Sequence, residues 1–185
     1  WLNTGGYAEL KGQTNISFVY RALNEELFHG VRFDNINRST WEVESRPLSS
    51  LSFSLEMEFG RFIRRSDTPS LGQGHNISVE ATLKPTSQFQ FNLSYERARL
   101  SDLNTGELFY DGYLARAVGI YQFTPEIFLR LISQYDSFEK SIDVYPLLSY
   151  KLNPFTIFYA GSTSSLMDYG DTPGIKQTAR QYFVK

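Results

Sequence analysis

The stretch of sequence that decides the fold is Ser50-Leu-Ser-Phe-Ser-Leu-Glu-Met-Glu-Phe-Gly60. Its odd positions hold Leu, Phe, Leu, Met and Phe, and its even positions hold Ser, Ser, Ser, Glu, Glu and Gly. Successive side chains of a β-strand point to opposite faces, so this stretch predicts a strand with one apolar and one polar face. A helix would mix the two sets of side chains, because its period is about 3.6 residues and not 2.

The same alternation recurs along most of the chain and predicts about ten strands that meander in chain order. The weakest of them covers 31–45, and in 155–161 we assign Phe155, Ile157, Tyr159 and Gly161 to one face. The parity of the last run cannot be fixed from the sequence. The predicted strands cover 7–23, 31–45, 50–60, 76–84, 88–96, 110–123, 127–136, 142–152, 155–161 and 175–185.

The connections between these runs also follow a pattern. Short turns carry Pro47, Pro85, Pro125 and Pro154, and proline suits turns because it has no N–H for a strand ladder. Longer polar connections lie between them, at 24–30, 62–74, 101–106 and 166–174. Alternating short and long connections are typical of an up-and-down barrel with tight turns at one end. Pro146 falls inside a predicted strand, where we expect a bulge or a shift of one or two residues.

Composition narrows the class of protein. The chain has 185 residues, enough for one domain (1–185), and a formal charge of -2, which gives no sign of a nucleic-acid partner. It has no cysteine for a disulfide or a thiolate metal site, and no apolar run of about 18 residues for a membrane helix. It begins at Trp1 without a signal-peptide pattern, so we expect both ends to be cut.

Two features favour a barrel in lipid over a soluble sheet. The apolar positions are nearly free of charge, and the polar positions carry acids and bases together, as expected of side chains that pair across a lumen. Aromatic side chains gather near strand ends, where rings suit a membrane–water boundary. They are Trp41, Phe59, Phe62, Phe89, Tyr95, Phe109, Tyr110, Phe123, Tyr135, Tyr150, Phe155 and Tyr159. The alternative is a soluble sandwich whose core these aromatics fill.

The alternation assigns each strand residue to one side of such a barrel. The residues predicted to face lipid are Leu51, Phe53, Leu55, Met57, Phe59, Ile77, Val79, Leu83, Phe89, Phe91, Leu93, Ile127, Leu129, Leu131, Ile142, Val144 and Leu148. The residues predicted to face the lumen are Ser52, Ser54, Glu56, Glu58, Glu80, Gln90, Asn92, Glu96, Arg116, Arg130, Gln134, Asp143 and Lys151. In hydrocarbon every backbone N–H and C=O needs a partner, so the sheet has to close. About ten strands leave a narrow interior filled by side chains, and missing chain at the amino end would make the barrel larger.

Four segments of the carboxyl-terminal third carry a resemblance to a known family, namely Tyr121-Gln-Phe-Thr-Pro-Glu-Ile-Phe-Leu-Arg-Leu-Ile-Ser-Gln-Tyr-Asp136, Leu148-Ser-Tyr-Lys-Leu-Asn-Pro154, Phe158-Tyr-Ala-Gly161 and Arg180-Gln-Tyr-Phe-Val-Lys185. They resemble the closing hairpins of a bacterial outer-membrane family of unknown function. The resemblance is good over 121–185 and looser before it. It implies a membrane β-barrel that is normally preceded by a sugar-binding module similar to carbohydrate-binding family 9. That module is not part of these residues, so no sugar site and no catalytic residue is carried over.

The only two histidines, His29 and His75, fall in or beside the longer connections and are expected at the same rim. Asp34, Asp67 and Asp111 are candidates to lie near them, and a His/Asp pair can activate water, which would make the protein a rim-located hydrolase. No nucleophile motif accompanies these residues, so we favour ordinary loop histidines.

A cation site is the other chemical candidate. Glu56 and Glu58 could hold a divalent ion together with Glu80 from a neighbouring strand, but salt bridges to lumenal Arg and Lys are the favoured interpretation. The segment 102–106 lacks the distal Glu of a calcium loop and is interpreted as a turn. We therefore predict no metal and no cofactor.

Together these patterns predict a non-enzymatic bacterial outer-membrane β-barrel. It would serve as a membrane anchor or transport element for a periplasmic sugar-binding module. Its predicted partners are outer-membrane lipid, the barrel-assembly machinery and, through the module, a saccharide. The alternatives are a soluble antiparallel sandwich that binds carbohydrate and the rim-located hydrolase.

Overall fold

The structure is a computed structural model that describes residues 1–168 and 176–185. Within these residues all regular structure is β-strand, and there is no helix that could cross a bilayer. The strands are β1 (Leu2–Leu10), β2 (Thr14–Phe28), β3 (Val31–Leu48), β4 (Leu51–Arg64), β5 (Ser70–Leu83), β6 (Phe89–Asp102), β7 (Leu108–Gln122), β8 (Ile127–Asp136), β9 (Ser141–Asn153), β10 (Thr156–Met167) and β11 (Lys176–Val184).

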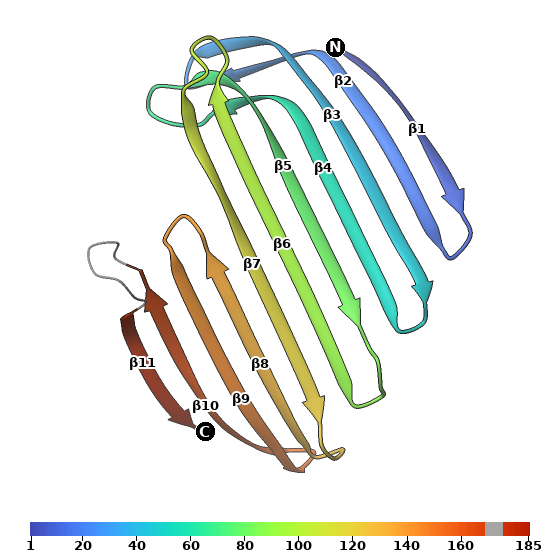
Figure 1. Cartoon of the computed structure of the whole chain (residues 1–185), viewed down its shortest axis with the longest axis vertical. Coiled ribbons are helices and arrows are strands. Elements are labelled where there is room, and N and C mark those ends of the chain that lie inside the picture. The colour runs from blue at the N-terminus through green and yellow to red at the C-terminus, as the bar shows by residue number, and fades with distance from the viewer. Residues whose placement is uncertain (169–175) are drawn as a thin grey trace. The chain divides into compact units, whose positions relative to one another are not determined.

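Each strand pairs with the next one in the sequence, so the sheet order is β1 to β11 without a crossover (Figure 1). Neighbouring strands are antiparallel. The predicted all-β, up-and-down meander is therefore confirmed, with eleven strands in residues 1–168 and 176–185 in place of about ten. Of the predicted connection 166–174, the part from 169 onward lies outside the described residues. Residues 166 and 167 belong to β10, which ends at Met167.

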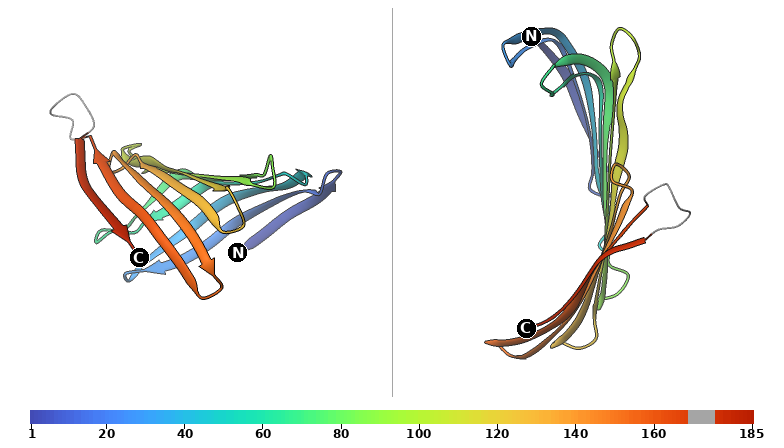
Figure 2. Two further views of the ribbon diagram at one scale, coloured as in Figure 1. Left: turned by 90° about the horizontal axis from the view of Figure 1, so that it is seen from below. Right: turned by 90° about the vertical axis from the view of Figure 1, so that its left-hand side faces the viewer.

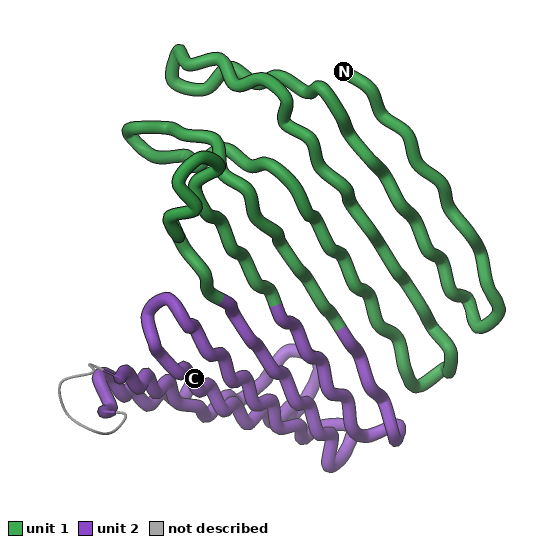
Figure 3. The backbone as a smooth tube through the Cα atoms, turned by 45° about the horizontal axis from the view of Figure 1, so that its top comes forward, with its two compact units in different colours: residues 1–80, 96–112 green, residues 81–95, 113–185 purple. Residues whose placement is uncertain are grey.

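The chain divides into two compact units (Figure 3). Unit 1 contains residues 1–80 and 96–112, and unit 2 contains residues 81–95 and 113–185. Within unit 1 the strands β1–β4 form a single layer, and within unit 2 the strands β8–β11 also form a single layer (Figure 2). We describe each unit by itself.

The first predicted strand, 7–23, is wrong, because the structure places a hairpin there. Leu10 pairs with Thr14 across a turn in which Gly12 and Gln13 have φ angles of 79° and 52°. Leu10 and Thr14 share a face, so the alternation keeps its phase through the turn. That continuity made two strands look like one in the sequence.

Two of the predicted long connections are also wrong, because strands extend through most of them. β2 runs to Phe28 and turns in the two residues His29 and Gly30, whose φ angles of 48° and 77° are those of a type I′ turn. β4 continues to Arg64, and only 65–69 separates it from β5. Charged side chains pair across these strand ends, as in the ion pair between Arg65 and Glu26. The polar residues that predicted loops at 24–30 and 62–74 therefore lie mostly in exposed or half-buried parts of strands.

The prolines follow the prediction in part. Pro85, Pro125 and Pro154 lie in turns, but Pro47 lies within β3, close to its end. The bulge or shift expected at Pro146 is absent, because Pro146 pairs with Leu131 in an unbroken β8–β9 register. The pairing of β9 with β10 also keeps one register across Pro146, because Leu147 pairs with Gly161 and Val144 pairs with Ser164.

Few apolar side chains are buried among the described residues. The largest buried cluster is formed in unit 1 by Phe33, Ile36 and Ile63, with Phe28 and Leu71 packed against it. Two bulges in the β2–β3 pairing accompany this cluster, and Leu23 and Asn35 have positive φ angles there. Most large hydrophobic side chains of the strands are exposed or half-buried.

Candidate membrane-facing surface and polar face

The apolar face of unit 1 is built from rows of residues that the strand register places side by side. Phe18 of β2 pairs with Trp41 of β3, and Trp41 pairs with Met57 of β4. The rings of Phe18 and Trp41 lie 4.2 Å apart between centroids. The next row contains Ile16, Val43 and Leu55.

The apolar face of unit 2 is organised in the same way. Leu129 of β8 pairs with Tyr121 of β7 and with Leu148 of β9. Two residues further along β8, Leu131 lies between Gly119 and Pro146 and is 45% exposed. Small neighbours therefore leave the middle of this face open at Leu131.

None of the residues predicted to face lipid is buried. Phe53, Phe59, Leu83, Leu93, Leu131 and Leu148 are exposed, and the others are half-buried. The registers of β3–β4 and β8–β9 place the predicted lipid-facing residues of each strand on one face of the sheet. This holds for Leu51–Phe59, 127–131 and 142–148. That these residues contact lipid stays a prediction.

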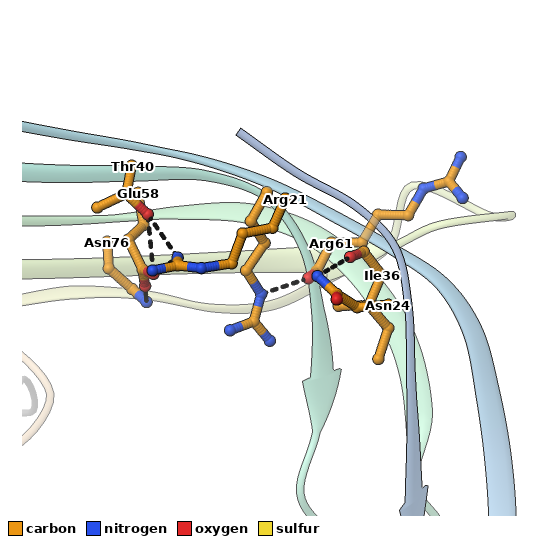
Figure 4. Close-up of polar contacts among 8 residues, drawn as sticks. Arg21, Asn24, Ile36, Thr40, Glu58, Arg61 and Asn76 are labelled. Atoms are coloured by element: carbon orange, nitrogen blue, oxygen red, sulfur yellow. Dashed lines mark hydrogen bonds and ion pairs between the residues drawn. The ribbon is translucent and has the colours of Figure 1, made fainter. Parts of the chain in front are cut away.

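The polar face of unit 1 carries a chain of contacts across four strands (Figure 4). Arg21 donates a hydrogen bond from Nη1 to Thr40 Oγ1 at 2.9 Å and lies 4.0 Å from Glu58 Oε1. Asn76 donates to Glu58 Oε2 at 3.5 Å, so β5 joins the same group. Arg21, Thr40 and Asn76 were missed in the sequence, because only the register brings them to Glu58.

The predicted lumenal carboxylates of unit 1 are only partly paired with bases. Glu56 pairs in register with Glu42, whose Oε2 accepts a hydrogen bond from Ser17 at 2.9 Å. Glu56 and Glu80 are exposed, and Ser52 and Ser54 are half-buried on β4. Glu96, at the unit 1 end of β6, is exposed. In the described chain, no group of three or more acidic or histidine side chains is arranged to hold a metal ion.

The polar face of unit 2 is less polar than the sequence predicts. Asn92 Oδ1 accepts hydrogen bonds from Thr82 and Gln90 at 3.0 Å each, and Arg116, Gln134 and Asp143 form one row in register. The same face also carries apolar side chains, because it includes Val118, Ile120, Ile132 and Leu147. Arg130 lies between Ile120 and Leu147, and Lys151 is exposed near the end of β9.

The predicted parity of β10 is wrong relative to β9. Tyr159 pairs with Ser149, whereas Ala160 pairs with Leu148 on the apolar face. A register shift between Thr156 and Ile157 reverses the faces to which the following residues of β10 belong. The structure also fixes the parity of the last strand, since Val184 pairs with Ala160.

The two histidines contact aromatic rings, whereas Asp34 and Asp111 pair with arginines. His29 occupies the β2–β3 turn and stacks on Phe28, and His75 lies within β5, 6.0 Å from the Phe59 ring, and not in a connection. Asp34 binds Arg32, and Asp111 binds Arg97. In the described ranges neither histidine is hydrogen-bonded to Asp34, Asp67 or Asp111.

The segment 102–106 forms a turn, as predicted. The Asp102 carboxylate accepts hydrogen bonds from the backbone N–H groups of Thr105 and Asn104 at 2.8 Å each. These bonds, led by that from Thr105, hold the pKa of Asp102 below its ordinary value. The Asp102 side chain therefore stabilises the turn between β6 and β7.

The geometry thus defines an antiparallel meander with an uncovered apolar face in each unit. Comparison of the chain with protein-family models, with curated proteins and with solved structures finds no match. The function has therefore to be argued from the side chains themselves.

Proposed function

We propose that this chain is part of a bacterial outer-membrane β-barrel that serves as a membrane anchor or transport element without catalysis. The observation that carries the proposal is the uncovered apolar face of each unit. On it, alternate residues of consecutive strands are apolar and none of the predicted lipid-facing residues is buried. Acyl chains are the solvent that such a face fits.

The energetic reason is the size of the exposed apolar surface. Exposed residues include Trp41, Phe53, Phe59, Leu131 and Leu148. Removing one such side chain from water is favourable by roughly 1.5–3 kcal/mol, and soluble monomers rarely expose contiguous apolar patches beyond a few hundred Å². A soluble sandwich would bury these residues under a second sheet. The described residues of each unit show no such packing.

The strand number bears on how such a barrel would close. The described chain contributes eleven strands with antiparallel neighbours, so β1 and β11 run in the same direction. Joining them directly would create a parallel pair, whereas bacterial single-chain barrels have even numbers of antiparallel strands. The proposal therefore requires an odd number of additional strands in the closed barrel.

The resemblance of 121–185 to the outer-membrane family supports the anchor role. It adds to the proposal a sugar-binding module on the periplasmic side, and through it a saccharide partner. Insertion of the barrel would depend on the barrel-assembly machinery. On the polar side, the contacts of Glu58 with Arg21 and Asn76 would cross-link strands along the lumenal wall.

The test is the membrane behaviour of the full-length protein that carries this chain, expressed in a bacterium. We expect it in the outer-membrane fraction, extractable only with detergent, and shifted in gel mobility between unheated and boiled samples in dodecyl sulfate. The shift reports a closed sheet that resists the detergent until heated. Recovery as a monodisperse monomer from the aqueous fraction without detergent would refute the proposal.

A further inference from the structure

Along the β6–β7 hairpin, the side chains on the face that is apolar elsewhere change from aliphatic to aromatic to charged within a few residues. On β6 the same parity carries Leu93, Tyr95 and Arg97 in succession. On β7, Tyr113 is followed at the next position towards the loop by Asp111. The rings of Tyr95 and Tyr113 lie 5.5 Å apart. Arg97 Nη2 contacts both carboxylate oxygens of Asp111, at 3.1 and 3.2 Å.

The tyrosine pair belongs to a row across three strands of unit 2. Tyr113 also contacts Tyr135 of β8, with 5.5 Å between ring centroids. At the opposite end of β7, Tyr121 contacts Phe123 at 4.9 Å and Phe89 at 6.4 Å. Two aromatic rows therefore bracket the aliphatic part of this face.

The spacing of the two rows fits a bilayer. From Tyr113 to Phe123 the chain covers about 34 Å of strand at about 3.4 Å per residue. With a strand tilt of about 40°, this corresponds to about 26 Å along the membrane normal, close to the apolar band of about 25 Å flanked by aromatic girdles in membrane barrels.

Beyond the tyrosines, residues 97–111 have packing of their own within unit 1. Leu100 is fully buried, and Gly72 of β5 makes room for it, since a Cβ there would lie 2.8 Å from Leu100 Cδ1. Arg99 approaches Asp111 at 3.8 Å, and Arg64 of β4 lies over the Phe109 ring at 4.4 Å. This segment is therefore folded by protein contacts and carries several charges.

Those charges set the level of the segment relative to lipid. An arginine on the lipid side of a barrel is strongly unfavourable at the bilayer midplane and close to neutral near the interfaces. The Arg97–Asp111 pair and Arg99 are thus tolerated only at or outside the boundary of the hydrocarbon. Tyrosine, with an apolar ring and a polar hydroxyl, is the residue type that favours the boundary itself.

We infer that the hydrocarbon boundary crosses the β6–β7 hairpin between the Tyr95–Tyr113 pair and the Arg97–Asp111 pair. Residues 97–111 then lie in water and lipid headgroups. This inference rests on the proposed function and adds to it the depth of the chain in the membrane.

Single cysteines test the boundary, because the chain contains none of its own. The variants Leu93→Cys and Arg99→Cys place a thiol on the same parity of β6, on either side of the tyrosine row. Isolated outer membranes carrying each full-length variant are treated with a membrane-impermeant maleimide. Labelling rates are normalised to those of the denatured samples. We expect Arg99→Cys to label at least tenfold faster than Leu93→Cys.

The other outcomes separate the two levels of the argument. Slow labelling at both positions would overturn the inferred boundary and leave the barrel proposal standing. Fast labelling at both would overturn the barrel proposal and the boundary with it. If Arg99→Cys fails to assemble, Ser101→Cys takes its place, because Ser101 lies two residues further along the same parity.

Discussion

Leu131→Arg is expected to destabilise the membrane-inserted protein by about 2–4 kcal/mol, the cost of an arginine on the lipid side of a barrel near the midplane. Leu131 lies midway between Ile127 and Tyr135 on β8. Its register neighbours Gly119 and Pro146 offer no carboxylate to pair with the new charge. Urea titration of the protein folded into phospholipid vesicles, followed by the gel-mobility shift, measures the difference.

The matched control places the same side chain on the opposite face of the same strand. Gln134→Arg joins a row that already contains Arg116 and Asp143, so we expect its unfolding free energy to stay within about 0.5 kcal/mol of the parent. Equal stability of Leu131→Arg and Gln134→Arg would show that both faces meet water, against the proposed membrane location.

The second large effect is expected at Gly60 of β4. Gly60 has a φ angle of 145°, which side chains rarely adopt, and an added Cβ would overlap the backbone oxygen of Asn37 and lie 2.8 Å from Arg38 Cα. Strain of this kind costs of the order of 1–3 kcal/mol before the overlap is counted. Gly60→Val is therefore expected to lower the folded yield strongly, measured by the fraction of protein that shows the gel-mobility shift.

Gly119 supplies the control for that substitution. It lies in β7, its φ is not positive, and a Cβ there meets no atom within 4 Å. Gly119→Val is expected to fold with the yield of the parent, because β-branched residues suit an open strand position. A normal yield for Gly60→Val would mean that the close approach of β3 and β4 at Asn37 is not required for folding.

Strict alternation made most of the fold predictable from the sequence. In Leu51–Phe59 the side-chain period matches the pleat, so a strand is the only regular structure that separates the two sets. The turns at Pro85, Pro125 and Pro154 were predictable for a different reason, since proline cannot donate to a ladder. Together these two local rules give the antiparallel meander.

Features that depend on how strands pair were not predictable. The turn at Gly12 and Gln13 preserves the phase of alternation, so nothing in the pattern reveals it. The parity of Tyr159 was misassigned, because apolar residues occupy both faces of β10 and a bulge at Thr156 resets the phase. The strand ends around Arg65 look like loop, since their charges are paired across strands and not along the chain.

For the candidate surface, too, some features follow from sequence position alone and others depend on which strands pair. Within a strand of unbroken alternation, the face of a side chain follows from its own position in the sequence, as for Leu129 and Arg130. The partners of Glu58, namely Arg21 and Asn76, come from strands far apart in the sequence, and only the register identifies them. The ion pair between Arg97 and Asp111 likewise comes from two strands and is identified by their pairing.

The proposed contact between the apolar face and acyl chains can be tested at Trp41. This residue lies on the apolar face of unit 1 and is 42% exposed, and Trp1, the other tryptophan, is removed by Trp1→Phe. In vesicles of lipids brominated along the acyl chains, we expect Trp41 fluorescence to be strongly quenched and to be insensitive to aqueous acrylamide. Efficient quenching by acrylamide with none by the brominated lipids would contradict the account.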